Sequence, residues 1–137
     1  MINLVIAIQS AMMHSKYAQL ERDVCRVYAY YSNESASMNH TILMLGFMDG
    51  AIKIHFDQIK LLLKRLTSCL RRIKSGQSCA HSGFFFSAST LRAYPIDSLA
   101  KELATLDSAL QYEIQACHKK ITKRSRRKGF RVRASSY

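Results

Sequence analysis

Residues 52–73, IKIHFDQIKLLLKRLTSCLRRI, carry the most regular apolar pattern in the chain. Their apolar side chains recur at alternating steps of four and three residues, which places them on one face of an α-helix. This near-heptad spacing lets side chains interdigitate between helices that cross at about 20°. A long amphipathic helix is therefore predicted, ending near Ser75–Gly76, where glycine can adopt the left-handed closing conformation. The apolar row consists of Ile52, Phe56, Ile59, Leu63, Leu66, Leu70 and Ile73.

Two glycines complicate the start of this helix. Ile42, Leu45 and Met48 extend the apolar row backwards. Gly46 and Gly50 oppose the extension, because glycine costs about 1 kcal/mol relative to alanine inside a helix. We expect one continuous helix from about residue 41, with close helix packing at the glycines. The alternative is a break near Gly50, which would give four helices in place of three.

Two further segments show helical periodicity. Over residues 2–32 the apolar side chains again recur at steps of four and three, and the polar residues 33–37 are expected to end that helix. The last helix is expected to begin at Tyr94–Pro95, because proline favours the first position of a helix. Its apolar row covers residues 99–121 and stops where a basic run begins.

Between the second and third apolar rows, residues 76–94 lose the helical period. We expect a loop there, held to the helices by the three phenylalanines at 84–86. One proline and five glycines favour long uninterrupted elements over a loop-rich β fold. The predicted fold is therefore all-α, an antiparallel bundle of three long helices. We expect a bundle domain over residues 1–123 and a basic tail over residues 124–137.

The charge of the chain is strongly unbalanced. Twenty-one Lys and Arg residues face nine Asp and Glu residues, for a formal net charge of +12, and residues 60–74 and 119–133 contain no acid. Solvated helix faces usually mix acids with bases, so repulsion within these two stretches favours an anionic partner. The candidate binding residues are Lys60, Lys64, Arg65, Arg71, Arg72, Lys74, Lys119, Lys120, Lys123, Arg124, Arg126, Arg127, Lys128, Arg131 and Arg133.

These cations indicate a non-enzymatic nucleic-acid-binding protein that acts through phosphate contacts. Arginine makes two-point contacts to phosphate, and its plane stacks on bases. Phe130 and Tyr137 lie near enough in the sequence to add stacking, which favours RNA slightly over duplex DNA. Phosphate contacts carry no sequence information, so no sequence specificity is expected. A subunit of a larger ribonucleoprotein fits the same features.

A second interpretation is a helical protein–protein interaction subunit or assembly factor of a larger complex. The apolar rows are long for three helices to cover alone, so they could pack on partner helices or on a second copy in a homodimer. The basic tail would then bind an acidic protein surface. Methionine suits adaptable contact surfaces, and the first half of the chain holds Met12, Met13, Met38, Met44 and Met48.

We expect no catalytic site, because the chain has no phosphate loop, no HExxH or GxSxG motif and no carboxylate pair isolated in an apolar run. The four cysteines lack CxxC spacing and fit buried free thiols of a reducing, intracellular compartment, most simply the cytoplasm. Cys69, Cys79, His81 and Cys117–His118 have ligand atoms that suit zinc, but their spacing matches no zinc motif, so no metal and no cofactor are predicted. No stretch approaches the roughly 18 apolar residues of a membrane span.

Overall fold

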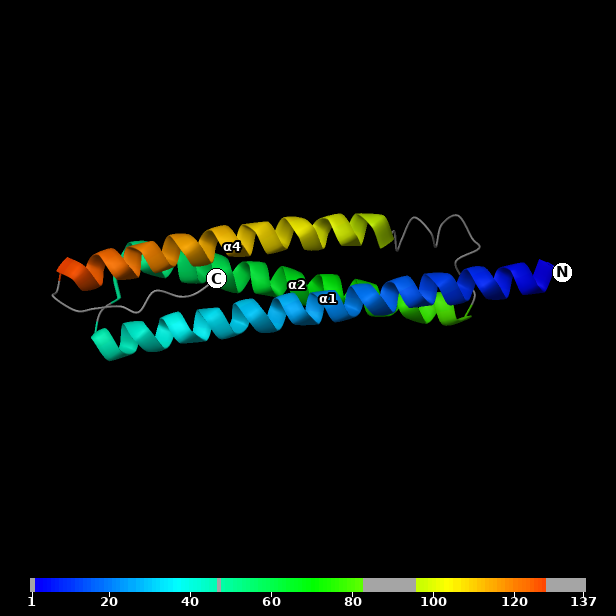
Figure 1. Cartoon of the computed structure of the whole chain (residues 1–137), viewed down its shortest axis with the longest axis horizontal. Helices are drawn as coiled ribbons and strands as arrows, with labels where there is room; N and C mark the ends of the chain where they lie inside the picture. Colours follow the sequence, from blue (N-terminus) through cyan, green and yellow to red (C-terminus); the bar gives the residue numbers. More distant parts are fainter. Residues whose placement is uncertain (1, 47, 83–95, 128–137) are drawn as a thin grey trace.

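The computed structural model describes residues 2–46, 48–82 and 96–127. Nearly all of these residues form three long helices: α1 (Ile2–Leu45), α2 (Gly50–Ser82) and α4 (Ile96–Arg127). The helices lie side by side along one long axis (Figure 1). The prediction of an all-α chain of three packed helices is confirmed. The phenylalanines at 84–86 lie outside the described residues.

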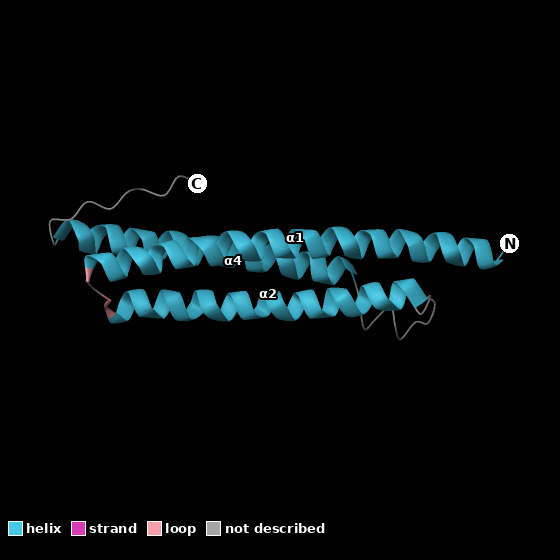
Figure 2. Ribbon diagram, turned by 90° about the horizontal axis from the view of Figure 1, so that it is seen from below, coloured by secondary structure: helices cyan, strands magenta, loops and turns pink. Residues whose placement is uncertain are grey.

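Consecutive helices run in opposite directions. His55 of α2 lies beside Glu113 of α4, whereas Arg72 lies beside Glu102, so rising residue numbers on α2 meet falling numbers on α4. Figure 1 shows the same reversal between α1 and α2. At its N-terminal end α1 extends beyond both other helices, as the two views in Figures 1 and 2 show. Each helix packs against the other two.

The expected continuity of the helix through Gly46 and Gly50 is wrong, because the chain turns between them. Gly46 has a φ of 72°, and its N–H donates to the carbonyl oxygen of Ile42 at 2.9 Å. Glycine adopts this left-handed conformation without steric cost, and it closes α1. Asp49 starts α2, since its Oδ1 accepts a hydrogen bond of 2.9 Å from the Ile52 N–H, which has no partner within the helix. The apolar row that is continuous in the sequence is therefore divided between two helices, α1 and α2.

The polar residues 33–37 do not end the first helix, which continues to Leu45. Met38 and Ile42 are buried at spacings that continue the row of Tyr31, also buried. The buried apolar row therefore resumes after the polar stretch, within which Glu34 and Ser35 are half-buried and Glu34 lies near His118 of α4. Composition alone suggested a break because it does not distinguish a polar loop from the polar face of a helix.

Gly76 does not end α2, which continues to Ser82, so the predicted start of the loop at residue 76 is wrong. A Cβ at Gly76 would lie 2.5 Å from Cε1 of Tyr17, and the ring of Tyr17 is fully buried. The missing side chain thus lets an aromatic ring from α1 lie directly on the backbone of α2. This glycine serves close helix packing.

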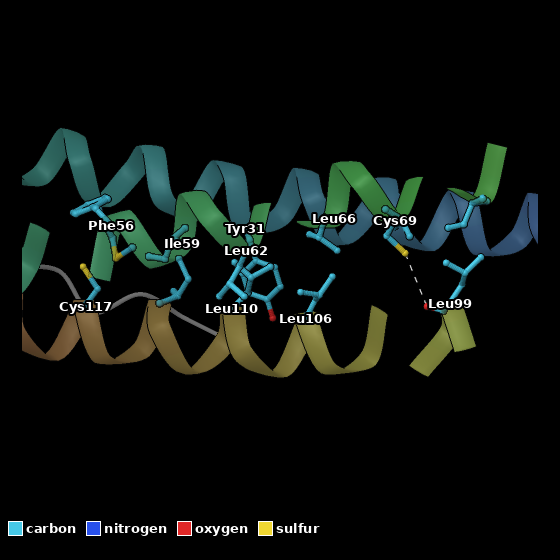
Figure 3. Packing of buried hydrophobic residues seen from close by; sticks show 14 of the residues in the cluster. Tyr31, Phe56, Ile59, Leu62, Leu66, Cys69, Leu99, Leu106, Leu110 and Cys117 are labelled. Atoms are coloured by element: carbon cyan, nitrogen blue, oxygen red, sulfur yellow. Dashed lines mark hydrogen bonds between the residues drawn. The ribbon is translucent and has the colours of Figure 1, made fainter. Parts of the chain in front are cut away.

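The core is one apolar cluster to which all three helices contribute. Figure 3 shows Leu62 and Leu66 of α2 facing Leu106 and Leu110 of α4, with the ring of Tyr31 among them. Side chains seven residues apart stay on one side of a helix in this type of packing. Four fully buried residues of α2 follow that spacing, Ile52, Ile59, Leu66 and Ile73, and Cys69 is fully buried beside this row.

Replacing Gly76 by alanine is expected to destabilise the protein, although alanine is the better helix former by about 1 kcal/mol. The new Cβ has no room beside the buried Tyr17 ring, so we expect the free energy of unfolding to fall by about 1–3 kcal/mol. Urea denaturation followed by circular dichroism measures it. Gly50→Ala is the matched control, because no atom lies within 4 Å of its Cβ. A Gly76→Ala protein as stable as the control would contradict the packing.

Candidate nucleic-acid interface

The acidic residues of this chain are concentrated between its helices. All nine lie within the described residues, and five of them contact a different helix. The five contacts are Glu34 with His118, Asp49 with Arg124, Glu102 with Arg72, Asp107 with Tyr31 and Glu113 with His55. Carboxylates that connect helices are not free to neutralise distant surface cations.

Two of these contacts fix α4 on its neighbours. The Tyr31 hydroxyl donates to Asp107 Oδ1 at 2.5 Å, which joins α1 to α4. Nδ1 of His55 lies 2.6 Å from Oε2 of Glu113, which joins α2 to α4. The side chains of this second pair are only 15% and 19% exposed. Hydrogen bonds to an ionised carboxylate are short and about twice as strong as neutral ones, so these pairs set the register of the bundle.

The six candidate residues of α2 are exposed, but they divide between its two flanks. Arg72 faces α4, where its Nη1 lies 2.7 Å from Oε2 of Glu102. Arg65 precedes it by seven residues and shares that flank. Lys60 lies on the flank toward α1, and Lys74 shares its row, while Lys64 and Arg71 lie on the adjacent outer row. Glu102 partly neutralises the flank toward α4, and Asp57 partly neutralises the flank toward α1.

The candidate residues of α4 gather around its C-terminal end. Arg124 is half-buried, with its Nε 3.8 Å from Oδ2 of Asp49. Ser125 and Ile121 are buried, so residues 124–127, which were expected in the tail, belong to the helix. Arg127 ends α4, and Lys128, Arg131 and Arg133 lie outside the described residues. The exposed members of this cluster are Lys119, Lys120, Lys123 and Arg126.

The two cationic clusters lie at different levels of the bundle, because residues 60–74 span the middle of α2 and residues 119–126 lie at the C-terminal end of α4. Arg72 meets Glu102 near the start of α4, whereas Arg124 meets Asp49 next to the start of α2 (Figure 1). Lys53, which is exposed, extends the α2 cluster toward the α4 cluster. Sequence analysis missed Lys53 because Asp57 separates it from the acid-free stretch, although its seven-residue spacing to Lys60 is a usable signal.

A recess of about 560 Å³, here called the α1–α2 groove, lies on the flank of α2 that faces α1. Ser32, Ser35, Ala36 and Asn39 of α1 form one wall. The other lining residues are Met48, Lys53, Phe56, Asp57, Lys60 and Leu63. The groove thus combines a cationic wall with a wall of small, uncharged side chains, an arrangement that can hold an anionic chain.

Tyr112 is a further surface residue that sequence analysis missed. Its side chain is 69% exposed and lies seven residues before Lys119, with Arg126 another seven residues on. These three residues share the outer face of α4. An exposed ring beside cations is the combination with which proteins stack bases and hold phosphates.

The cysteines form no metal site in the described residues, which contain no group of three or more potential metal ligands. Burial raises the pKa of the Cys69 thiol, whose Sγ lies 4.0 Å from the Leu99 carbonyl oxygen (Figure 3). Burial, followed by the charge of Glu113, raises the pKa of Cys117 to about 11. Cys117 is 18 residues beyond Leu99 along α4, or about 27 Å. The two buried thiols are therefore too far apart to share a zinc ion.

Comparison of the chain with protein-family models, curated proteins and solved structures finds no match. Among the described residues, no helix is apolar over enough of its length to cross a bilayer. The functional interpretation therefore depends on the residues of the molecule itself.

Thiol labelling tests the burial of the cysteines. In a Cys79→Ser variant at pH 8, we expect a disulfide reagent to label Cys25 quickly and to spare Cys69 and Cys117 until denaturant is added. The thiolate is the reactive form, and a pKa near 11 leaves very little of it at Cys117 at this pH. Mass spectrometry of the labelled peptides shows the order in which the cysteines react. Labelling of Cys117 in the native protein as fast as Cys25 would contradict its burial.

Proposed function

We propose that this protein binds nucleic acid, with RNA slightly preferred, and that it acts without catalysis through phosphate contacts. One observation carries the proposal: nine of the candidate cations are exposed and form no ion pair with any carboxylate of the described residues. Their mutual repulsion is relieved by an anionic polymer. They are Lys60, Lys64, Arg65, Arg71, Lys74, Lys119, Lys120, Lys123 and Arg126.

The arrangement of the acids supports this proposal. Most carboxylates already hold helices together, and moving one of them to the surface would break a contact between helices. The four acids without such a contact, Glu21, Asp23, Asp57 and Asp97, are too few to neutralise the nine exposed cations. Cys69 and Cys117 are buried as expected, whereas Cys25 is exposed, and free thiols fit the reducing, intracellular compartment that we propose for the protein.

Removing residues 128–137 should weaken RNA binding while leaving the bundle intact. The cut falls after Arg127 because α4 extends to that residue and Ile121 and Ser125 are buried within it. The deletion removes Lys128, Arg131 and Arg133, so the slope of log K against log salt should become less steep by about 2, at about 0.7 per phosphate contact to a single strand. Fluorescence anisotropy with a labelled RNA at several salt concentrations measures this slope.

Circular dichroism of the truncated protein controls for folding. The full-length protein should also copurify with nucleic acid that high salt or nuclease removes. A full-length protein with a clean absorbance spectrum and no affinity for either RNA or DNA at low salt would refute nucleic-acid binding.

A second candidate function, a helical interaction subunit that pairs with a partner or a second copy, is favoured by the N-terminal part of α1. This part extends beyond the other helices (Figure 2) and contains no charged residue over residues 2–13. Leu4, Val5, Ile8 and Met12 are each more than half exposed. Apolar side chains gathered in this way are typical of surfaces that bind other proteins. The cations would then bind an acidic protein surface.

Self-association tests this second function. If the N-terminal part of α1 binds a second copy, the protein should remain dimeric in high salt, because apolar contacts are not screened. A Leu4→Glu/Ile8→Glu variant should then be monomeric in light scattering. Leu43→Glu/Met44→Glu is the matched control, since these side chains are 71% and 74% exposed at the other end of α1. Wild-type protein that is monomeric throughout would exclude the homodimer.

A further inference from the structure

The cationic wall of the α1–α2 groove continues along α2 beyond the groove itself. Lys60 and Lys74 follow Lys53 at multiples of seven residues, and Lys64 and Arg71 share that spacing on the adjacent row. All five are exposed, and none pairs with a carboxylate in the described part of the chain. From Lys53 to Lys74 the row is about 31 Å long, at 1.5 Å per residue. The flank therefore presents a line of five cations along α2, with one acid, Asp57, among them.

A straight line of this length suits a single strand better than a duplex. One turn of duplex DNA takes about 34–36 Å. Over the length of the row, either strand of a duplex would therefore wind almost once around the duplex axis. Most of its phosphates would then lie away from the cations. A single strand has no such constraint and can follow a positively charged groove along its whole length.

The wall formed by α1 suits the other parts of a nucleotide. Ser32 and Ser35 offer hydroxyl groups, and Asn39 offers an amide, so all three can donate and accept hydrogen bonds. Base edges and the ribose 2′-hydroxyl are the groups that proteins read on unpaired RNA. The groove volume of about 560 Å³ also lies within the roughly 300–1,000 Å³ of typical ligand sites.

We propose that the α1–α2 groove is the path of single-stranded RNA, with phosphates along the cations of α2 and sugars and bases toward α1. This inference rests on the proposed function, because it names the form of nucleic acid and the face that holds it. Asp57 is the one acidic side chain among the lining residues, and it weakens the row by one charge.

The first test removes two charges from the groove. Lys53→Gln/Lys60→Gln is compared with Lys16→Gln/Lys101→Gln, which makes the same charge change at exposed positions elsewhere. The probe is a labelled oligouridylate, with an RNA duplex of the same length beside it. Single-strand affinity should fall roughly 25-fold at 0.1 M salt in the groove variant, and the salt slope should become less steep by about 1.4. The control variant should lose much less single-strand affinity.

Asp57→Asn provides a test in the opposite direction. Removing this negative charge from the row should raise single-strand affinity, by up to about fivefold at 0.1 M salt if one further cation becomes fully available to a phosphate. Affinity unchanged or lower would contradict the path along this wall.

The last test fills the groove without changing its charge. Ala36→Trp places an indole among the lining residues, whereas Asn33→Trp, at an exposed position outside the lining, is the matched control. Single-strand affinity should fall about tenfold in the first variant alone, and duplex affinity should stay unchanged. If Ala36→Trp does not fold, as judged by circular dichroism, the lysine variants decide.

The outcomes separate the two proposals. Wild-type protein that binds neither RNA form overturns the proposed function itself. Wild-type protein that binds RNA, with groove variants behaving like their controls or with a preference for the duplex, overturns only the groove. Binding of polyglutamate as tight as binding of RNA overturns the groove as an RNA site and favours an acidic protein partner.

Discussion

The structure depends on carboxylates that lie between helices. A chain with nine acids and 21 bases has few negative charges to distribute, and five of them join one helix to another. Apolar contacts are not directional, so they bring helices together without choosing one register among several. Pairs such as Tyr31 with Asp107 and His55 with Glu113 are directional and select it. The excess of positive charge comes from the composition, and carboxylates held in these pairs are not available to the surface cations.

Three glycines show how much a residue's role depends on its neighbours. Gly46 adopts a positive φ and closes α1, with Asp49 capping the helix that follows. Gly76 lies within α2 and is buried under the ring of Tyr17. Gly50 begins α2 with open space around it. At Gly46 the conformational freedom of the backbone matters, and at Gly76 the absence of a side chain matters. Nothing in the local sequence distinguishes these roles.

The positively charged side chains are distributed over separate parts of the surface. On α2 the cations that face α4 lie near Glu102, while those that face α1 meet only uncharged residues across the groove. On α4 the cations gather at the far end, with Tyr112 on the same face as Lys119. Because screening acts over about 8 Å at physiological salt, cations of the two clusters that lie farther apart than this repel one another only weakly. A long anionic chain can engage both.

The sequence alone determined the helices, because apolar spacing depends only on each segment's own residues: the rows around Leu66 and Leu110 lie where predicted. It also determined the excess of positive charge. Only the tertiary structure decided where helices end, since the fates of Gly46 and Gly76 depend on chain reversal and on Tyr17. It alone decided that Arg72 is paired and Lys60 is not, because ion pairs form across helices. The local spacing of apolar residues determines which face of a helix is apolar. The residues that this face contacts depend on the whole fold.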